Sequence, residues 1–191
     1  MPKSYHDPEH VGYQEVDHQF QVWLADNFQL PPRGVLLIAT PETTVVGPKN
    51  PALLEERGRI LQDYLAQALN ARLLRPKSLV DRNQPGLPRA DYRLETTIVD
   101  YSEGDRATSL SIIPGSFGAG HPWILVRGKL VDLRSGRPLF RFVAKRGFEG
   151  REAGASWTGH EDPLKAQIKD LALDCADLVE RARDGRSLLS K

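Results

Sequence analysis

The sequence has one cysteine and one methionine in 191 residues. The lone Cys175 excludes an intrachain disulfide, and its place on an apolar helical stripe predicts a buried thiol. No apolar run approaches the roughly 20 residues that a membrane-spanning helix needs. The first residues contain neither a signal-peptide core nor a lipidation cysteine, so we expect the chain as given to be soluble.

Net charge is also small, because 26 lysines and arginines stand against 25 aspartates and glutamates. A formal charge of +1 argues against attraction of the whole molecule to DNA or to a membrane surface. Charge must therefore be judged locally. No repeat, low-complexity tract or interdomain linker interrupts the chain.

The length suits one compact α+β domain, which buries roughly 70% of the surface of its unfolded chain. We assign residues 31–191 to this domain and residues 1–30 to an N-terminal extension. Apolar residues recur in the extension at spacings of three to five, which predicts an amphipathic helix. A strand added to the sheet edge would have nearly the same apolar content and is the alternative. The positions are Tyr13, Val16, Phe20, Trp23 and Phe28.

The remaining pattern predicts about five strands in a mixed, mainly antiparallel sheet, with two long helices on one face. Asn50 and Asp162 each precede a proline, which is typical of a helix N-cap followed by the first helical residue. Both following segments have one apolar stripe, and two such stripes need a common sheet to bury against. The predicted helices are Pro51–Leu73 and Pro163–Arg183, and the predicted strands outside the hairpin described next are residues 35–39, 73–80, 92–101 and 108–113.

Residues 123–133 and 139–148 are rich in β-branched and aromatic types and are separated by a short turn. The Ser135-Gly136 pair supplies the positive φ that such a turn requires, so a β-hairpin is predicted. Alternation places Phe140 and Phe142 on one face and Arg141 and Lys145 on the other. Residues 35–39, by contrast, form a continuous apolar run, which predicts a strand buried on both faces.

The hairpin is locally basic. From Arg127 to Arg151, eight basic residues stand against two acidic ones, a local charge of +6. This predicts a binding face, although an ordinary half-solvated sheet would show the same alternation. Residues 146–148 resemble the start of an RNA-recognition strand, which makes RNA binding a further alternative. The predicted contact residues on this face are Arg127, Lys129, Arg141 and Lys145.

A glycine-rich loop at residues 114–120 precedes the hairpin. Its backbone N–H groups could hold an anion, but a strand follows it instead of a helix, and the Lys-Ser/Thr pair of a P-loop is missing. It almost matches a serine nucleophile elbow, but Pro114 stands where glycine is needed. We therefore predict no catalytic residue, metal or cofactor, and keep a phosphorylated-metabolite or hydrolytic site as an alternative. The loop's candidate binding residues are Gly115, Ser116, Gly118 and Gly120.

The stretch GSFGAG followed by WILVRGKLVDLRSGRPLFRF resembles a family of bacterial envelope proteins of unknown function. In that family a glycine-rich loop precedes a strand ending in Asp, then a turn with Gly and a returning strand; Asp132 and Gly136 match. The architecture is similar to the N-terminal domain of TolB and to curli-secretion-lipoprotein and penicillin-binding-protein-activator domains. The resemblance implies a non-enzymatic adaptor or assembly module whose partner is a protein or a cell-wall polymer. It implies a location in the periplasm or on the periplasmic face of the outer membrane if a leader has been removed, and a cytoplasmic one otherwise.

Overall fold

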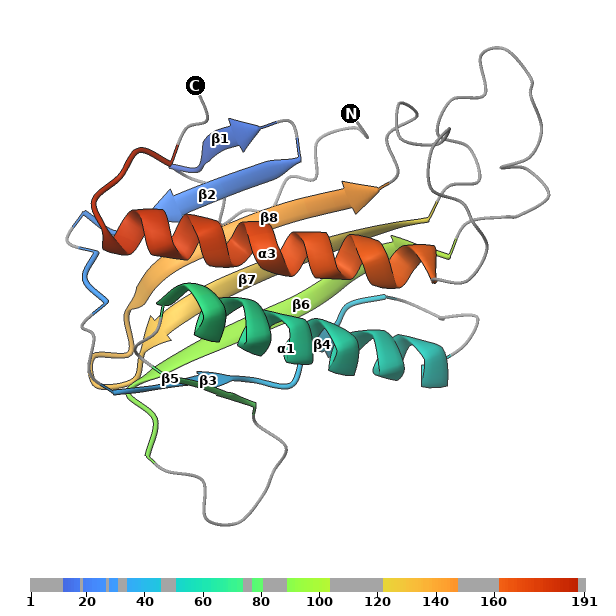
Figure 1. The fold of residues 1–191 in the computed structure, drawn as a ribbon, viewed down its shortest axis with the longest axis horizontal. Helices are drawn as coiled ribbons and strands as arrows, with labels where there is room; N and C mark the ends of the chain where they lie inside the picture. The colour runs from blue at the N-terminus through green and yellow to red at the C-terminus, as the bar shows by residue number, and fades with distance from the viewer. Residues whose placement is uncertain are drawn as a thin grey trace.

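The computed structural model describes residues 12–17, 19–26, 28–30, 34–45, 51–73, 77–80, 89–103, 122–147 and 162–188. Within these ranges eight strands form one mixed sheet in the order β1-β2-β8-β7-β6-β3-β5, with β4 paired to β6. The two helices of the described residues cover one face (Figure 1). The predicted fold class is confirmed, but the sheet is larger than the five strands expected. The elements are β1 (Gln14–Asp17), β2 (Phe20–Leu24), β3 (Val35–Ile38), β4 (Glu42–Thr43), α1 (Pro51–Leu73), β5 (Lys77–Val80), β6 (Tyr92–Ser102), β7 (Trp123–Asp132), β8 (Pro138–Gly147) and α3 (Pro163–Arg183).

The predicted hairpin is confirmed as β7 and β8, which pair antiparallel along almost their whole length. Asp132 closes the turn between them: its carboxylate accepts hydrogen bonds from the Arg134 N–H (2.8 Å) and the Ser135 hydroxyl (3.0 Å). The backbone N–H of Arg134 is the main reason that the pKa of Asp132 lies below its usual range. Gly136 has φ +69°, which a residue with a side chain rarely adopts.

The predicted N-terminal helix is wrong. Residues 14–24 instead contain β1 and β2, and β2 pairs antiparallel with β8, so the edge-strand alternative describes this segment. Phe20 and Val22 are each 1% exposed and point to the helix side, whereas Trp23, the residue after Val22, points the other way. The strand forms because the β8 ladder satisfies its backbone hydrogen bonds and buries every second side chain. Spacings of three to five fit this short segment almost as well, which explains the error.

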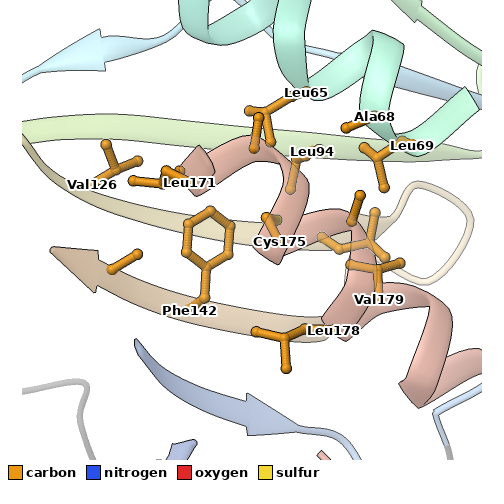
Figure 2. Close-up of a cluster of buried hydrophobic side chains, with 14 of the residues drawn as sticks. Leu65, Ala68, Leu69, Leu94, Val126, Phe142, Leu171, Cys175, Leu178 and Val179 are labelled. Carbon is orange, nitrogen blue, oxygen red and sulfur yellow. The ribbon is translucent and has the colours of Figure 1, made fainter. Parts of the chain in front are cut away.

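The helices α1 and α3 lie side by side over the same face of the sheet, as Figure 1 shows. Both begin and end where the sequence predicts. Asp162 caps α3 by accepting hydrogen bonds from the Leu164 and Lys165 N–H groups at 3.1 and 3.4 Å. Figure 2 shows α3 side chains, Cys175 among them, packed toward Phe142 of β8, and the predicted burial of Cys175 is confirmed. None of the described helices is long and apolar enough to cross a membrane.

A parallel crossover completes the sheet. The chain passes from β3 through α1 to β5, and β3 pairs in parallel with both β5 and β6. Strand β5 is the sheet edge, as predicted for a strand interrupted by a proline. It is shorter than the predicted residues 73–80, because Leu73 is the last residue of α1. In β3, Leu36 and Ile38 are buried while Val35 and Leu37 are half-buried, so this strand alternates and is not equally buried on both faces. The strand predicted at residues 108–113 lies outside the described residues.

Candidate functional site

The side of β2, β8, β7 and β6 opposite α1 and α3 is called the open face below, because no described helix covers it. Side chains alternate between this face and the core. Phe140, Phe142 and Ala144 of β8 are fully buried on the helix side. The four cations predicted from the hairpin occupy the intervening positions of β7 and β8, so the structure brings them to one face. They are Arg127, Lys129, Arg141 and Lys145.

Four side chains form a row across the open face, one from each of four neighbouring strands. Trp23 of β2 lies directly opposite Arg141 of β8. Arg141 in turn lies opposite Lys129 of β7, and Lys129 lies opposite Glu95 of β6. The Arg141 guanidinium carbon lies 5.2 Å from the centre of the Trp23 ring. At the other end, Lys129 Nζ lies 2.9 Å from Glu95 Oε2. This set is called the cross-strand row below.

The two middle residues of the cross-strand row, Lys129 and Arg141, are both positively charged. Residues directly opposite in an antiparallel pair have Cβ atoms roughly 5 Å apart, and like charges in these positions destabilise the sheet by a few tenths to about 1 kcal/mol. Lys129 and Arg141 are such a pair. The Trp23 ring and the Glu95 carboxylate each draw one of the two cations toward the end of the row. The arrangement concentrates positive charge on the face at a cost in stability.

The cross-strand row borders a hollow of about 350 Å³ on the open face. Arg93 of β6 and Arg127 of β7 line this hollow together with Lys129 and Arg141. The Nε atom of Arg93 lies 3.7 Å from Glu95 Oε1. Four cationic and two acidic side chains line the hollow, a net charge of +2 in a confined space. Its lining residues are Tyr13, Ala39, Thr40, Glu42, Arg93, Glu95, Thr96, Thr97, Arg127, Gly128, Lys129 and Arg141.

Lys145 lies on the same face but makes a different contact. Its ammonium nitrogen is 4.5 Å from the centre of the Trp123 ring, a second cation–π pair. Lys145 does not line the hollow. An indole beneath a cation keeps the charge oriented without neutralising it, because the ring has no net charge.

The local charge of +6 overstates what this surface offers. Arg146 is turned to the helix side, where its guanidinium contacts the Asp174 carboxylate of α3 and donates to Gln19 Oε1 at 2.7 Å. The loop residues predicted to bind, Gly115, Ser116, Gly118 and Gly120, lie outside the described residues.

The sequence does not predict Trp23, Arg93 and Glu95 as members of the site, nor Glu42, the second acid of the hollow. For two of them the signal was present, since the alternation of β6 places Arg93, Glu95 and Thr97 on one face. The sequence does not reveal that this face of β6 and the basic face of the hairpin form one continuous surface, because that depends on the register of β6 with β7. The predicted N-terminal helix places Trp23 outside the sheet, so the sequence does not connect this residue with the hairpin.

A second ionic cluster lies at the other side of the sheet. Arg57 of α1 has a side chain only 6% exposed, and its guanidinium binds Glu103 with two hydrogen bonds, of 3.0 and 3.3 Å. It also pairs with Asp162, the cap of α3. This cluster ties α1, the end of β6 and α3 together, so its chemistry is structural.

Complete burial raises the pKa of the Cys175 thiol well above its usual value, which keeps it protonated and unreactive. Within the described residues no three His, Cys, Asp or Glu side chains are grouped so that they could hold a metal ion.

No protein-family model matches the sequence, and no curated protein matches it. Solved structures do share its arrangement of strands and helices. A chain of the PelC dodecamer from Paraburkholderia phytofirmans is similar with a TM-score of 0.51 and 12% identity, over 81% of this chain and 95% of that one. This likeness shows a common fold and nothing about activity.

Two further bacterial structures are similar at lower scores. A Xanthomonas campestris protein of the family model DUF330 has a TM-score of 0.48 and 14% identity, over 86% of this chain and 94% of that one. A minor lipoprotein from Acinetobacter baumannii has a TM-score of 0.36 and 13% identity, over 78% of this chain and 94% of that one.

Proposed function

We propose that the protein is a non-enzymatic binding module of the bacterial envelope that holds an anionic polymer against its open face. The observation that carries the proposal is the directly opposed pair Lys129 and Arg141, bordering a hollow with two more arginines. Like charges in register weaken a sheet, and an anionic ligand offsets that cost by neutralising both. The envelope location rests on the resemblance of the hairpin and its preceding loop. The part assigned to residues 115–120 in binding stays a prediction.

The test compares three dextrans of equal length: dextran sulfate, neutral dextran and cationic diethylaminoethyl-dextran. We expect binding to dextran sulfate alone, weakening as salt rises because the contacts are exposed and ionic. The Lys129→Gln/Arg141→Gln double variant should lose at least about tenfold in affinity, since each charged hydrogen bond contributes about 1.5–3 kcal/mol.

The matched control removes two positive charges from the other side of the molecule. Arg59 of α1 and Lys169 of α3 are exposed on the helices, and Arg59→Gln/Lys169→Gln should bind dextran sulfate as the wild type does. Equal loss in the two double variants would mean that net charge, and not the open face, governs binding, and would contradict the proposal. Tighter binding to poly-glutamate than to dextran sulfate would assign an acidic polypeptide as the ligand instead. Fractionation of the native gene product, with the intact mass of the recovered chain, tests the envelope location.

A further inference from the structure

The cations of the hollow are mostly arginines. Arg93, Arg127 and Arg141 come from three adjacent strands, and Lys129 is the fourth. A guanidinium is planar and offers pairs of parallel N–H donors that match the oxygens of a carboxylate or a phosphate. The hollow of about 350 Å³ lies within the range of small-molecule sites, roughly 300–1,000 Å³. It is large enough for a charged group together with the unit that carries it.

One carboxylate already stands in the hollow. Glu95 places one oxygen 2.9 Å from Lys129 Nζ and the other 3.7 Å from Arg93 Nε. The second distance exceeds that of a hydrogen bond, so Glu95 engages Lys129 directly and Arg93 only through space. The side chains of Glu95 and Lys129 are 36% and 51% exposed. An exposed ion pair contributes at most about 1 kcal/mol, so an incoming anion can replace Glu95 at Lys129.

Displacing Glu95 from Lys129 costs the same free energy for every incoming anion, so the anion with the strongest interactions is favoured. A single carboxylate only replaces one carboxylate with another at Lys129 and gains little. A phosphate ester carries a charge of about −1.5 to −2 at pH 7 and three acceptor oxygens, so it can engage Lys129 and neighbouring arginines together. Resting on the proposed function, we infer that the hollow is a site for a phosphate ester, and that Glu95 occupies Lys129 until such an anion displaces it.

The experiment uses two dextrans matched in length and in degree of substitution, one carboxymethylated and one phosphorylated. Isothermal titration at pH 7.5 and fixed ionic strength measures both affinities. The wild type should bind phosphorylated dextran at least about tenfold more tightly than carboxymethyl dextran, a difference of about 1.4 kcal/mol. Glu95→Gln, which keeps the shape of the side chain, removes a negative charge from the hollow and should strengthen the binding of both polymers. The phosphorylated polymer should gain more, because the repulsion that is removed grows with the charge of the ligand.

Glu55→Gln is the matched control, because Glu55 is an exposed acid on α1 that pairs with Arg59, away from the open face. It should leave both affinities unchanged. If it strengthens binding as much as Glu95→Gln does, net charge explains the effect and the inference is overturned. Unfolding temperatures of both variants close to that of the wild type establish that the fold is intact.

The failures of the two proposals are distinguishable. Equal wild-type affinities for the two dextrans, with both lost in Lys129→Gln/Arg141→Gln, overturn the phosphate-ester site and leave the proposed function standing. Absence of binding to every anionic dextran overturns both. Glucose 6-phosphate separates the sources of the same chemistry: equal affinity per phosphate for this sugar and for the polymer indicates a small metabolite, and much tighter polymer binding indicates a phosphorylated polymer. Either result supports a phosphate-ester site, whereas no competition by glucose 6-phosphate and no preference for phosphorylated dextran contradict it.

Discussion

Replacing Gly128 with alanine tests whether the position of β7 against the core depends on the missing side chain. Gly128 lies opposite Phe142 in the β7–β8 ladder. A Cβ atom at this position would lie 2.3 Å from Cε1 and 2.5 Å from Cζ of the Phe142 ring. Carbon atoms pack at about 3.5–4.0 Å, so the ring would have to retreat by more than about 1 Å.

The ring has little room to move. Phe142 is completely buried and stacks on Phe20 at 5.6 Å between ring centres, with Phe140 at 6.1 Å. Figure 2 shows its helix side filled by residues of α3, including Leu171 and Cys175. Overpacking of a dense core costs about 1–3 kcal/mol, and a clash at two ring carbons belongs at the upper end. Alanine regains about 0.5–1 kcal/mol through its lower backbone entropy.

We therefore expect Gly128→Ala to lower the free energy of unfolding by about 2 kcal/mol, or the unfolding temperature by about 4–8 °C. Scanning calorimetry and guanidinium unfolding measure both quantities. Phe142→Leu is destabilising by itself, but the smaller side chain makes room for the new methyl group. The double variant should thus be at least about 1 kcal/mol more stable than the sum of the single effects. A Gly128→Ala protein as stable as the wild type, or strictly additive single effects, would refute the reasoning.

Three further outcomes are expected. Arg57→Met should lower the free energy of unfolding by about 2 kcal/mol. This is less than the loss of about 3–5 kcal/mol for a fully buried pair, because the side chains of Glu103 and Asp162 are 35% and 37% exposed and keep part of their water. No change in calorimetry would contradict the structural role of this cluster. Asp132→Ala should cost about 1 kcal/mol at pH 7. Folding lowers the pKa of Asp132, so this contribution to stability is complete above the unfolded-state pKa of about 3.9 and is lost as pH falls through the folded-state pKa. The unfolding temperatures of variant and wild type should therefore converge below about pH 4. A difference that stays constant with pH would contradict the role of the Asp132 carboxylate in the turn. Cys175 should react with a disulfide reagent rapidly in guanidinium and very slowly in buffer, and fast labelling of the native protein would show that α3 is not packed as described.

Long elements with end signals could be predicted from the sequence. The two helices carry a proline at the first position and a single apolar stripe, and the hairpin has long alternating strands around a Ser-Gly turn. In each case one period dominates over ten or more residues. The segment containing β1 and β2 has only four or five residues per strand, too few for a period to be determined. Tertiary pairing with β8 decides its conformation, and pairing is not written in local sequence.

In the candidate site, too, local features could be predicted from the sequence and the pairing of strands could not. Alternation within β8 correctly separates Phe140 and Phe142 from Arg141 and Lys145, because side-chain direction in a strand is a local property. Local sequence does not determine which strands lie beside the hairpin. Trp23 and Glu95, at the two ends of the cross-strand row, are therefore not predicted. Counting charge along the chain failed for a related reason.

Arg146 shows why a charge count along a strand cannot locate a binding surface. It is one residue from Lys145, yet the two side chains leave opposite faces of β8, and α3 supplies an aspartate to one of them. Where the core meets the sheet, cations are paired with acids of the covering helix. On the open face Lys129 pairs with Glu95 and Arg141 lies over the Trp23 ring, but the two cations stand directly opposite each other. If stability alone determined these positions, an acid opposite Lys129 within the hairpin would serve better, since opposite charges in register stabilise a sheet. The like pair is therefore the feature of the fold that stability explains least and that binding of an anion explains best.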